Sequence, residues 1–172
     1  IKEENKRYAD VIDGQQRLTT LSILFAVMAN TFQSEEFKKT CKKYLQEDGN
    51  ILEGISAQPR VFLRDRDQSF FSKYIQNIQL EQLAQIDPAT LDTESQRHIQ
   101  SNCAVLQERF QESFLGEEEL IKFSQFLLTR CYFVTVSTPN QESAFRVFSV
   151  MNNRGLDLLP TDIIKSMTIG NL

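Results

Sequence analysis

The sequence predicts an α+β fold that is mostly helical and has one small sheet. Apolar residues recur at helical spacing in two long stretches, one starting at Leu18 and the other at Glu94. Only short segments are rich in β-branched and aromatic residues, and the strongest of them is Cys131–Val136. A length of 172 residues with 41% hydrophobic content fits a single domain, residues 1–172, with a core of its own. Thirteen phenylalanines and no tryptophan suggest that phenylalanine and leucine fill much of that core.

The first elements are a short apolar strand, Tyr8–Ile12, then a turn, and then a helix from about Leu18. We expect this helix to bury one face, which would be formed by Leu21, Leu24, Phe25, Met28 and Phe32. A second helical piece runs through Tyr44 and Leu45. Its lysines are best interpreted as a solvated face rather than a phosphate-binding patch; they are Lys38, Lys39, Lys42 and Lys43.

The middle of the chain begins with a turn signal, Asp48-Gly49-Asn50, and a short predicted strand, Pro59–Arg64. Asp65 and Asp67 follow that strand. Two carboxylates at this spacing could ligate Mg²⁺ with the help of a nucleotide, but metal sites need further oxygen ligands, so a helix-initiating loop is the favoured interpretation. A helix is then expected from Asp67 to about Ile78.

A polar connection containing Asp87-Pro88 leads to a long amphipathic helix from about Glu94. Gly116 ends that helix and Glu117-Glu118-Glu119 opens the next, where negative charge is favourable. The apolar stripe of the long helix steps by three and four residues through Ile99, Cys103, Leu106, Phe110 and Phe114.

The last part of the chain contains the strand Cys131–Val136, which Pro139 stops, and a helix from Glu142 to Met151. We expect this strand to pair with Tyr8–Ile12 in the small sheet. Asn153 or Gly155 can adopt the left-handed conformation that ends the last helix, so this region has a purely structural interpretation as well.

The most informative segment for function is Asp13-Gly14-Gln15-Gln16-Arg17, between the first strand and the first helix. The N–H groups and the positive dipole end of a helix form an anion site, and Gly14 lets a ligand approach the backbone closely. Arg17 is a cation at the unfavourable end of the helix dipole, which suggests that something negative shares the site. Alternatively, Asp13 and Gln16 form an amide version of a capping box, which leaves Gln15 and Arg17 as solvated surface residues.

Composition excludes several classes of protein. The net charge of −4 and a pI near 5.1 argue against a basic DNA-coating surface. The three cysteines are far apart and form no Cys-x-x-Cys pattern, so we expect reduced thiols and no structural zinc. The single histidine, His98, fits a surface or packing position better than a catalytic one.

The sequence lacks a Walker-type phosphate loop. It also lacks a signal peptide and an uninterrupted apolar span, which predicts a cytoplasmic protein without a membrane partner.

Two stretches resemble a known family. Val11–Leu21 is similar to the signature of the domain family named for the N-terminal domain of GmrSD-type, modification-dependent restriction endonucleases. Phe148–Leu158, followed by Asp162–Lys165, is similar to the other signature of that family. The resemblance implies a ParB/sulfiredoxin-like core in which a strand-turn-helix unit handles nucleotide phosphates.

The resemblance also implies site residues. The first set, Asp13, Gly14, Gln15, Gln16 and Arg17, corresponds to the nucleotide-binding or modification-sensing motif. The second motif supplies Asn152, Arg154, Gly155, Asp162 and Lys165, and Asn152 and Arg154 would contact the ligand of the first motif. Asp162 and Lys165 have a spacing that allows a helical ion pair. The resemblance identifies no catalytic residue.

The leading hypothesis is a nucleotide-binding domain of a prokaryotic restriction or defence protein. Its ligand would be a nucleoside triphosphate, GTP or ATP, with Mg²⁺ as a possible companion. Whether the domain also hydrolyses the nucleotide stays open. The alternative is a non-catalytic module that recognises DNA or a protein partner and acts as a scaffold for a nuclease. Family members have a further segment upstream of the first motif, and many carry an HNH nuclease domain. We therefore expect this chain to be an internal fragment whose nuclease lies elsewhere, in the same or a partner chain, and whose contact with DNA depends on the full-length protein.

Overall fold

The computed structural model describes residues 9–31, 34–114 and 116–152. Contacts divide the chain into two compact units, which we describe separately. The first unit comprises Ile1–Gln15 and Tyr132–Leu172, and the second comprises Gln16–Cys131. A single-domain organisation over residues 1–172 stays a prediction.

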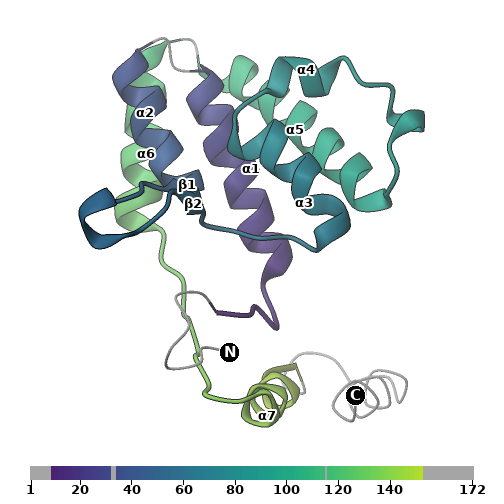
Figure 1. Ribbon diagram of the computed structural model, residues 1–172. Coiled ribbons are helices and arrows are strands. Elements are labelled where there is room, and N and C mark those ends of the chain that lie inside the picture. Colours follow the sequence, from purple (N-terminus) through teal and green to yellow (C-terminus); the bar gives the residue numbers. More distant parts are fainter. Residues whose placement is uncertain (1–8, 32–33, 115, 153–172) are drawn as a thin grey trace. The chain divides into compact units, whose positions relative to one another are not determined.

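The predicted fold class, mostly helical α+β, is confirmed (Figure 1). The described part of the first unit contains one helix, α7 (Gln141–Asn152). Helix α1 begins at Gln15, the last residue of the first unit, and continues into the second. The helices that lie in the second unit are α1 (Gln15–Thr31), α2 (Glu35–Leu45), α3 (Asp65–Phe71), α4 (Leu80–Ala84), α5 (Glu94–Ser113) and α6 (Glu117–Arg130), with short helical turns η1 (Ile51–Glu53), η2 (Ser72–Gln76) and η3 (Pro88–Thr90).

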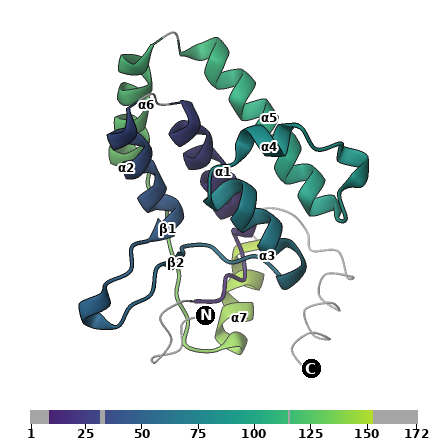
Figure 2. The same cartoon turned by 45° about the horizontal axis from the view of Figure 1, so that its top comes forward.

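Helix α1 is the central element of the second unit. Figures 1 and 2 show it between α2 and α6 on one side and α3, α4 and α5 on the other. It is therefore covered on more than one side, and the expected buried face is confirmed only in part. Met28 is buried, Leu24 and Phe25 pack against the core, and Phe32 lies outside the described residues. Leu21, Leu24 and Phe25 are only half-buried. Small residues allow the neighbouring helices to approach, and the buried positions of α1 are Ser22, Ile23, Ala26, Val27, Met28 and Ala29.

One hydrophobic core joins all six helices of the second unit. Its members outside α1 are Cys41, Leu45, Phe71, Ile75, Leu80, Leu83, Ile99, Cys103, Phe110 and Leu120. Phenylalanine contributes less to the buried centre than predicted, since only Phe71 and Phe110 are buried among the described phenylalanines. Other aromatic rings pack around the centre. Phe114 and Phe123 lie 5.0 and 5.6 Å from the Phe110 ring, centroid to centroid.

The small sheet is a hairpin of β1 (Gln46–Glu47) and β2 (Gln58–Pro59), paired antiparallel with Gln46 opposite Pro59. The turn signal at Asp48–Asn50 correctly predicts a reversal of the chain. A Cβ on Gly49 would lie 2.7 Å from the backbone nitrogen of Ala57, so only glycine fits there without a shift. The strand predicted over Pro59–Arg64 was wrong beyond Pro59, because the chain bends at Arg60 and Val61 before it reaches α3.

The sheet expected from Tyr8–Ile12 and Cys131–Val136 was wrong for the part of the chain that the structure describes. Residues 9–12 and 131–136 contain no strand. Side chains with high β-propensity do not form a strand without a neighbour that accepts and donates backbone hydrogen bonds. Tyr132 and Val134 are instead 85% and 94% exposed.

Buried glutamine side chains tie the connecting segments to the helices. The Gln76 Nε2 donates a 2.7 Å hydrogen bond to the carbonyl oxygen of Val61. The Gln100 Nε2 donates to the carbonyl oxygens of Leu83 and Ile86, at 2.8 and 2.7 Å. These bonds attach the segment before α3 and the end of α4 to the neighbouring helices.

Most helix boundaries agree with the prediction. Helix α5 begins at Glu94 as expected, and Gly116 caps α6. Helix α3 begins at Asp65, before the predicted start after Asp67, and the predicted continuation to about Ile78 includes the π-helical turn η2. The short helix α4 was missed. The residues expected to end α7, Asn153 and Gly155, lie outside the described residues.

Candidate functional site

The first motif forms a sharp bend directly before α1. Gly14 has φ of 92°, a left-handed conformation that only glycine adopts easily. The Asp13 Oδ1 accepts a 2.8 Å hydrogen bond from the N–H of Gly14. The Gln15 Nε2 donates a 2.8 Å hydrogen bond back to the carbonyl oxygen of Val11. The bend is therefore fixed by side chains of the motif itself.

Gln16 and Arg17 lie in the first turn of α1, and both are exposed. This turn, Gln15–Leu18, contains a cation and no carboxylate. A cation at this end of a helix is disfavoured by roughly 0.3–1 kcal/mol when it is exposed. The turn thus has the charge that favours an anion at the helix terminus.

The structure describes only the beginning of the second motif. Asn152 is the last residue of α7, and it belongs to the same unit as Asp13, Gly14 and Gln15. Arg154, Gly155, Asp162 and Lys165 lie outside the described residues, so their predicted contact with the ligand of the first motif stays a prediction.

Comparison with known families identifies the chain. The family model described as "GmrSD restriction endonuclease, N-terminal domain" matches residues 1–169. The chain belongs to this family. It is accordingly part of a restriction-type protein, and both motifs lie inside the matched region. No curated protein and no solved structure matches the chain.

Asp65 and Asp67 initiate a helix, which confirms the favoured interpretation of these two carboxylates. Asp67 is buried, and its Oδ1 accepts hydrogen bonds from Thr93 Oγ1 at 2.6 Å and from Gln96 Nε2 at 3.4 Å. Thr93 Oγ1 also accepts a 3.1 Å bond from the N–H of Gln96, so it caps α5. No group of three or more histidine, cysteine or acidic side chains suited to a metal ion is present in the described ranges.

Replacing Thr93 with valine should lower the free energy of unfolding by about 1–2 kcal/mol, because it removes the α5 cap and one donor to buried Asp67. Urea unfolding monitored by circular dichroism measures this loss. The control variant Thr93→Ser keeps the hydroxyl and should stay within about 0.5 kcal/mol of the wild type. Equal losses in both variants would contradict the capping role.

The remaining sequence candidates are structural or solvated. His98 is exposed, and its Nε2 lies 3.8 Å from the Glu94 Oε1 one helical turn away. All three cysteines are free thiols. Cys41 and Cys103 are buried in the core, whereas Cys131 is exposed. Within the described residues, no helix is long and apolar enough to cross a membrane.

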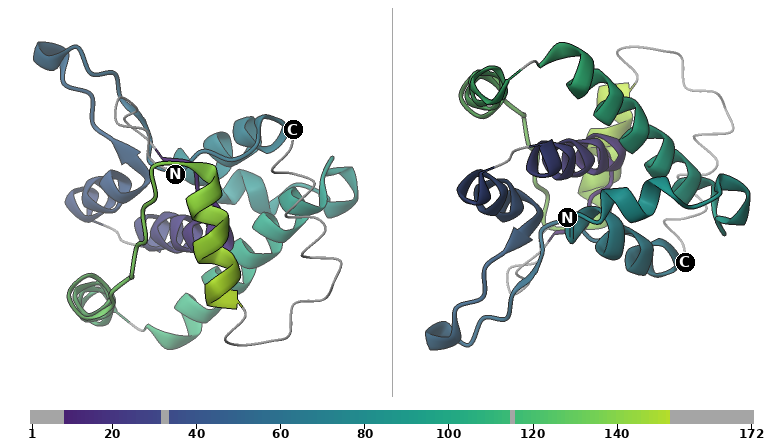
Figure 3. Two further views of the ribbon diagram at one scale, coloured as in Figure 1. Left: turned by 90° about the horizontal axis from the view of Figure 1, so that it is seen from below. Right: turned by 90° about the horizontal axis from the view of Figure 1, so that it is seen from above.

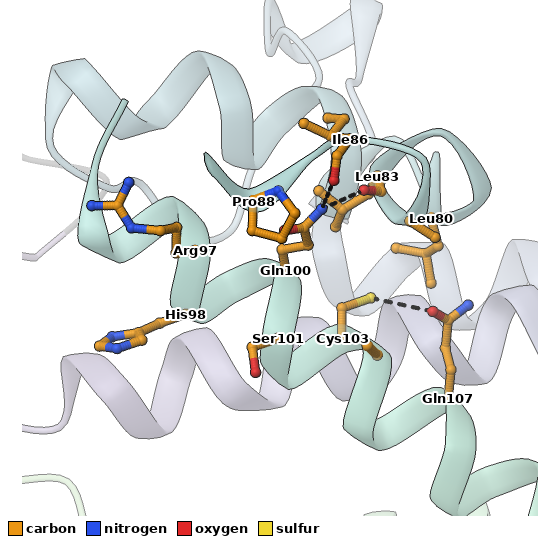
Figure 4. Close-up of a pocket in the computed structure, with 12 residues that line it drawn as sticks. Leu80, Leu83, Ile86, Pro88, Arg97, His98, Gln100, Ser101, Cys103 and Gln107 are labelled. Carbon is orange, nitrogen blue, oxygen red and sulfur yellow. Dashed lines mark hydrogen bonds between the residues drawn. The ribbon is translucent and has the colours of Figure 1, made fainter. Parts of the chain in front are cut away.

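Two features escaped sequence reasoning. The first is a pocket of about 530 Å³ along α4 and α5, shown in Figure 4, which contains no residue of the first motif. The second is the apolar pair Ile51-Leu52 at the tip of the hairpin, which is almost fully exposed. The sequence does contain a signal for the exposed tip. An Ile-Leu pair lies between Gly49-Asn50 and Glu53-Gly54, and turns seldom place two large apolar residues together.

Proposed function

We propose that this domain binds the phosphates of a nucleoside triphosphate at the bend Asp13–Arg17, as part of a restriction protein that responds to DNA modification. The observation that carries the proposal is the left-handed Gly14 directly before α1. A glycine without a Cβ at this point leaves the backbone accessible, and the first-turn N–H groups of a helix have no carbonyl partner within the helix. A phosphate group satisfies both conditions.

The side chains of the motif have distinct roles in this proposal. The Arg17 guanidinium supplies positive charge and planar donors for phosphate oxygens. The Gln15 amide holds the bend through its bond to Val11 and does not need to touch the ligand. The exposed Gln16 is the amide that would contact the base or sugar, or orient a water molecule for hydrolysis.

Asp13 is the only carboxylate of the motif, and a carboxylate beside phosphates normally needs a cation between them. Mg²⁺ bound to a triphosphate commonly takes one or two protein carboxylates together with phosphate oxygens and water. Asp13 fits that donor set. Its other role, the hydrogen bond with the N–H of Gly14, sets the direction of its carboxylate.

Replacing Arg17 with alanine should weaken nucleotide binding about tenfold to a hundredfold, because a charge-assisted hydrogen bond is worth roughly 1.5–3 kcal/mol. Titration of the chain and of the full-length protein with fluorescently labelled GTP and ATP measures this change. The control variant Arg109→Ala removes an exposed arginine paired with Glu112 on α5, so it should bind as the wild type does.

Equal affinity of wild type and Arg17→Ala would remove Arg17 from the proposed site. Phosphate release by the full-length protein then separates binding from hydrolysis. Modified DNA bound without any nucleotide dependence would favour the recognition module instead of the nucleotide-binding domain.

A further inference from the structure

The tip of the β1–β2 hairpin presents two apolar side chains to solvent. Ile51 is 96% exposed and Leu52 is 97% exposed. Single exposed apolar residues are ordinary on protein surfaces, but an adjacent pair at the end of a projecting arm indicates a contact surface. Figures 1 and 3 show the arm extending away from the helices of the second unit.

The tip is held in one conformation by its own hydrogen bonds. The Asn50 Oδ1 accepts from the N–H of Leu52 at 3.1 Å, and Gly54 ends the turn in the left-handed conformation. Asn50 and Ile55 also exchange two backbone hydrogen bonds, of 2.8 and 2.9 Å, across the base of the turn. Because the apolar pair is already ordered, a partner loses little free energy in fixing it.

The surroundings of the tip are acidic. Asp48 and Glu53 flank the apolar pair, and the segment from Gln46 to Pro59 contains no lysine or arginine. Neither of these two acids forms an ion pair within the described residues. The negative charge of Asp48 and Glu53 repels nucleic acid. A partner that fits the tip therefore has an apolar hollow for the two side chains and a cation beside it.

The pocket along α4 and α5 has these properties. It is walled on one side by Leu80, Leu83 and Ile86, and its volume of about 530 Å³ has room for two aliphatic side chains. Figure 4 shows Arg97 and His98 together at one end of the pocket.

Arg97 is the cation that the acidic tip requires. Its Nη1 donates to the carbonyl oxygen of Leu91 at 2.7 Å, and it forms no ion pair among the residues described. His98, in contrast, already faces Glu94. The guanidinium thus retains both its charge and further donors for a carboxylate.

We propose that the hairpin tip of one copy of this chain inserts into the α4–α5 pocket of a second copy. Ile51 and Leu52 fill the apolar part of the pocket, and Glu53 lies against Arg97. The hairpin does not reach the pocket of its own copy. Figure 1 and both views of Figure 3 show the hairpin and the pocket-forming helices α4 and α5 on opposite sides of α1.

This contact joins two different surfaces, so each copy has one free tip and one free pocket after a pair has formed. Contacts of this kind produce rings or open chains of subunits rather than closed two-fold dimers. One small contact supports only weak association, with Kd of roughly 0.1–1 mM.

Sedimentation velocity of the 172-residue chain, at concentrations up to about 1 mM, tests the proposal. The wild type should form a concentration-dependent series of oligomers. Leu52→Asp should weaken the association at least tenfold, as should Ala104→Trp, which fills the pocket from α5. The matched control is Val134→Asp, which places the same charge on a residue that is 94% exposed and belongs to neither surface. It should associate as the wild type does.

Mixing the two deficient variants gives the sharpest readout. The Leu52→Asp chain keeps its pocket and the Ala104→Trp chain keeps its tip, so an equimolar mixture should form one-to-one pairs and nothing larger. Likewise, Glu53→Arg and Arg97→Glu should each weaken association, and the double variant should restore it by exchanging the charges.

A wild type that stays monomeric over the whole concentration range would overturn the proposal. So would association that Leu52→Asp leaves unchanged, or a charge-exchanged double variant no better than the singles. If a fluorescent DNA duplex binds the wild type and loses affinity for Leu52→Asp, the tip contacts DNA and the proposal is wrong. Circular dichroism of each variant verifies that the helices remain folded.

Discussion

Replacing Phe71 with alanine is expected to lower the free energy of unfolding by about 3–5 kcal/mol, the usual cost of removing a fully buried aromatic ring. Phe71 is the last residue of α3 and is 0% exposed. Its ring belongs to the core that α1 and the other helices of the second unit share. Urea unfolding followed by circular dichroism gives the change from the midpoint and the slope.

Phe126 on α6 is the matched control, because it is a phenylalanine that is 59% exposed. Phe126→Ala should change the free energy of unfolding by no more than about 0.5 kcal/mol. Similar losses in the two variants would show that Phe71 does not lie at the centre of the core.

Raising the pH from about 9 to 11 is expected to lower the free energy of unfolding by about 4 kcal/mol through two thiols alone. Burial raises the pKa of Cys41 and that of Cys103, each from 9.0 to about 11. In this range the thiols ionise in the unfolded chain, whereas in the folded one they begin to ionise only as the pH approaches 11. The unfolded state then binds fewer protons, so stability is complete below pH 9 and is lost as the pH rises.

The double variant Cys41→Ala/Cys103→Ala isolates this effect, since lysines and tyrosines titrate equally in both proteins. Its stability at neutral pH should be lower because of the cavities, but its stability should fall less steeply between pH 9 and 11. Urea unfolding at several pH values measures both slopes. Identical slopes would mean that the two thiols do not change pKa on folding.

Helices with complete local signals could be predicted from the sequence. Helix α5 has an amphipathic stripe whose apolar residues step by three and four, and its start at about Glu94 was predicted correctly from it. Helix α6 has Gly116 and three glutamates at its start. These signals lie within a few residues of each other and do not depend on the rest of the fold.

Features that depend on distant partners could not be predicted. The extended segment Tyr132–Val136 has a strand composition, yet pairing requires another segment, which local sequence does not specify. The buried side of α1 was predicted only in part, because the large hydrophobic residues were considered and the fully buried Ala26 and Ala29 were not.

In the candidate site, too, local features could be predicted from the sequence and side-chain contacts could not. Gly14 was readable as a turn and Arg17 as a residue at the N-terminal end of a helix, and the structure confirms both, although α1 begins at Gln15, before the expected start near Leu18. The bond from Gln15 to Val11 was not predicted, because a glutamine has many partners within reach. The role of Asp67 was likewise fixed by Thr93 and Gln96, which lie far from it in sequence.

The buried amides of Gln76 and Gln100 also determine how the fold responds to changes in pH and to deamidation. An amide carries no titratable proton, so the hydrogen bonds to Val61, Leu83 and Ile86 persist from acid to alkaline conditions. Deamidation would replace the donating nitrogen with a carboxylate oxygen and bring it against carbonyl oxygens. At Gln100 that exchange would turn two attractions into two repulsions, so deamidation would weaken the attachment of the end of α4 to α5.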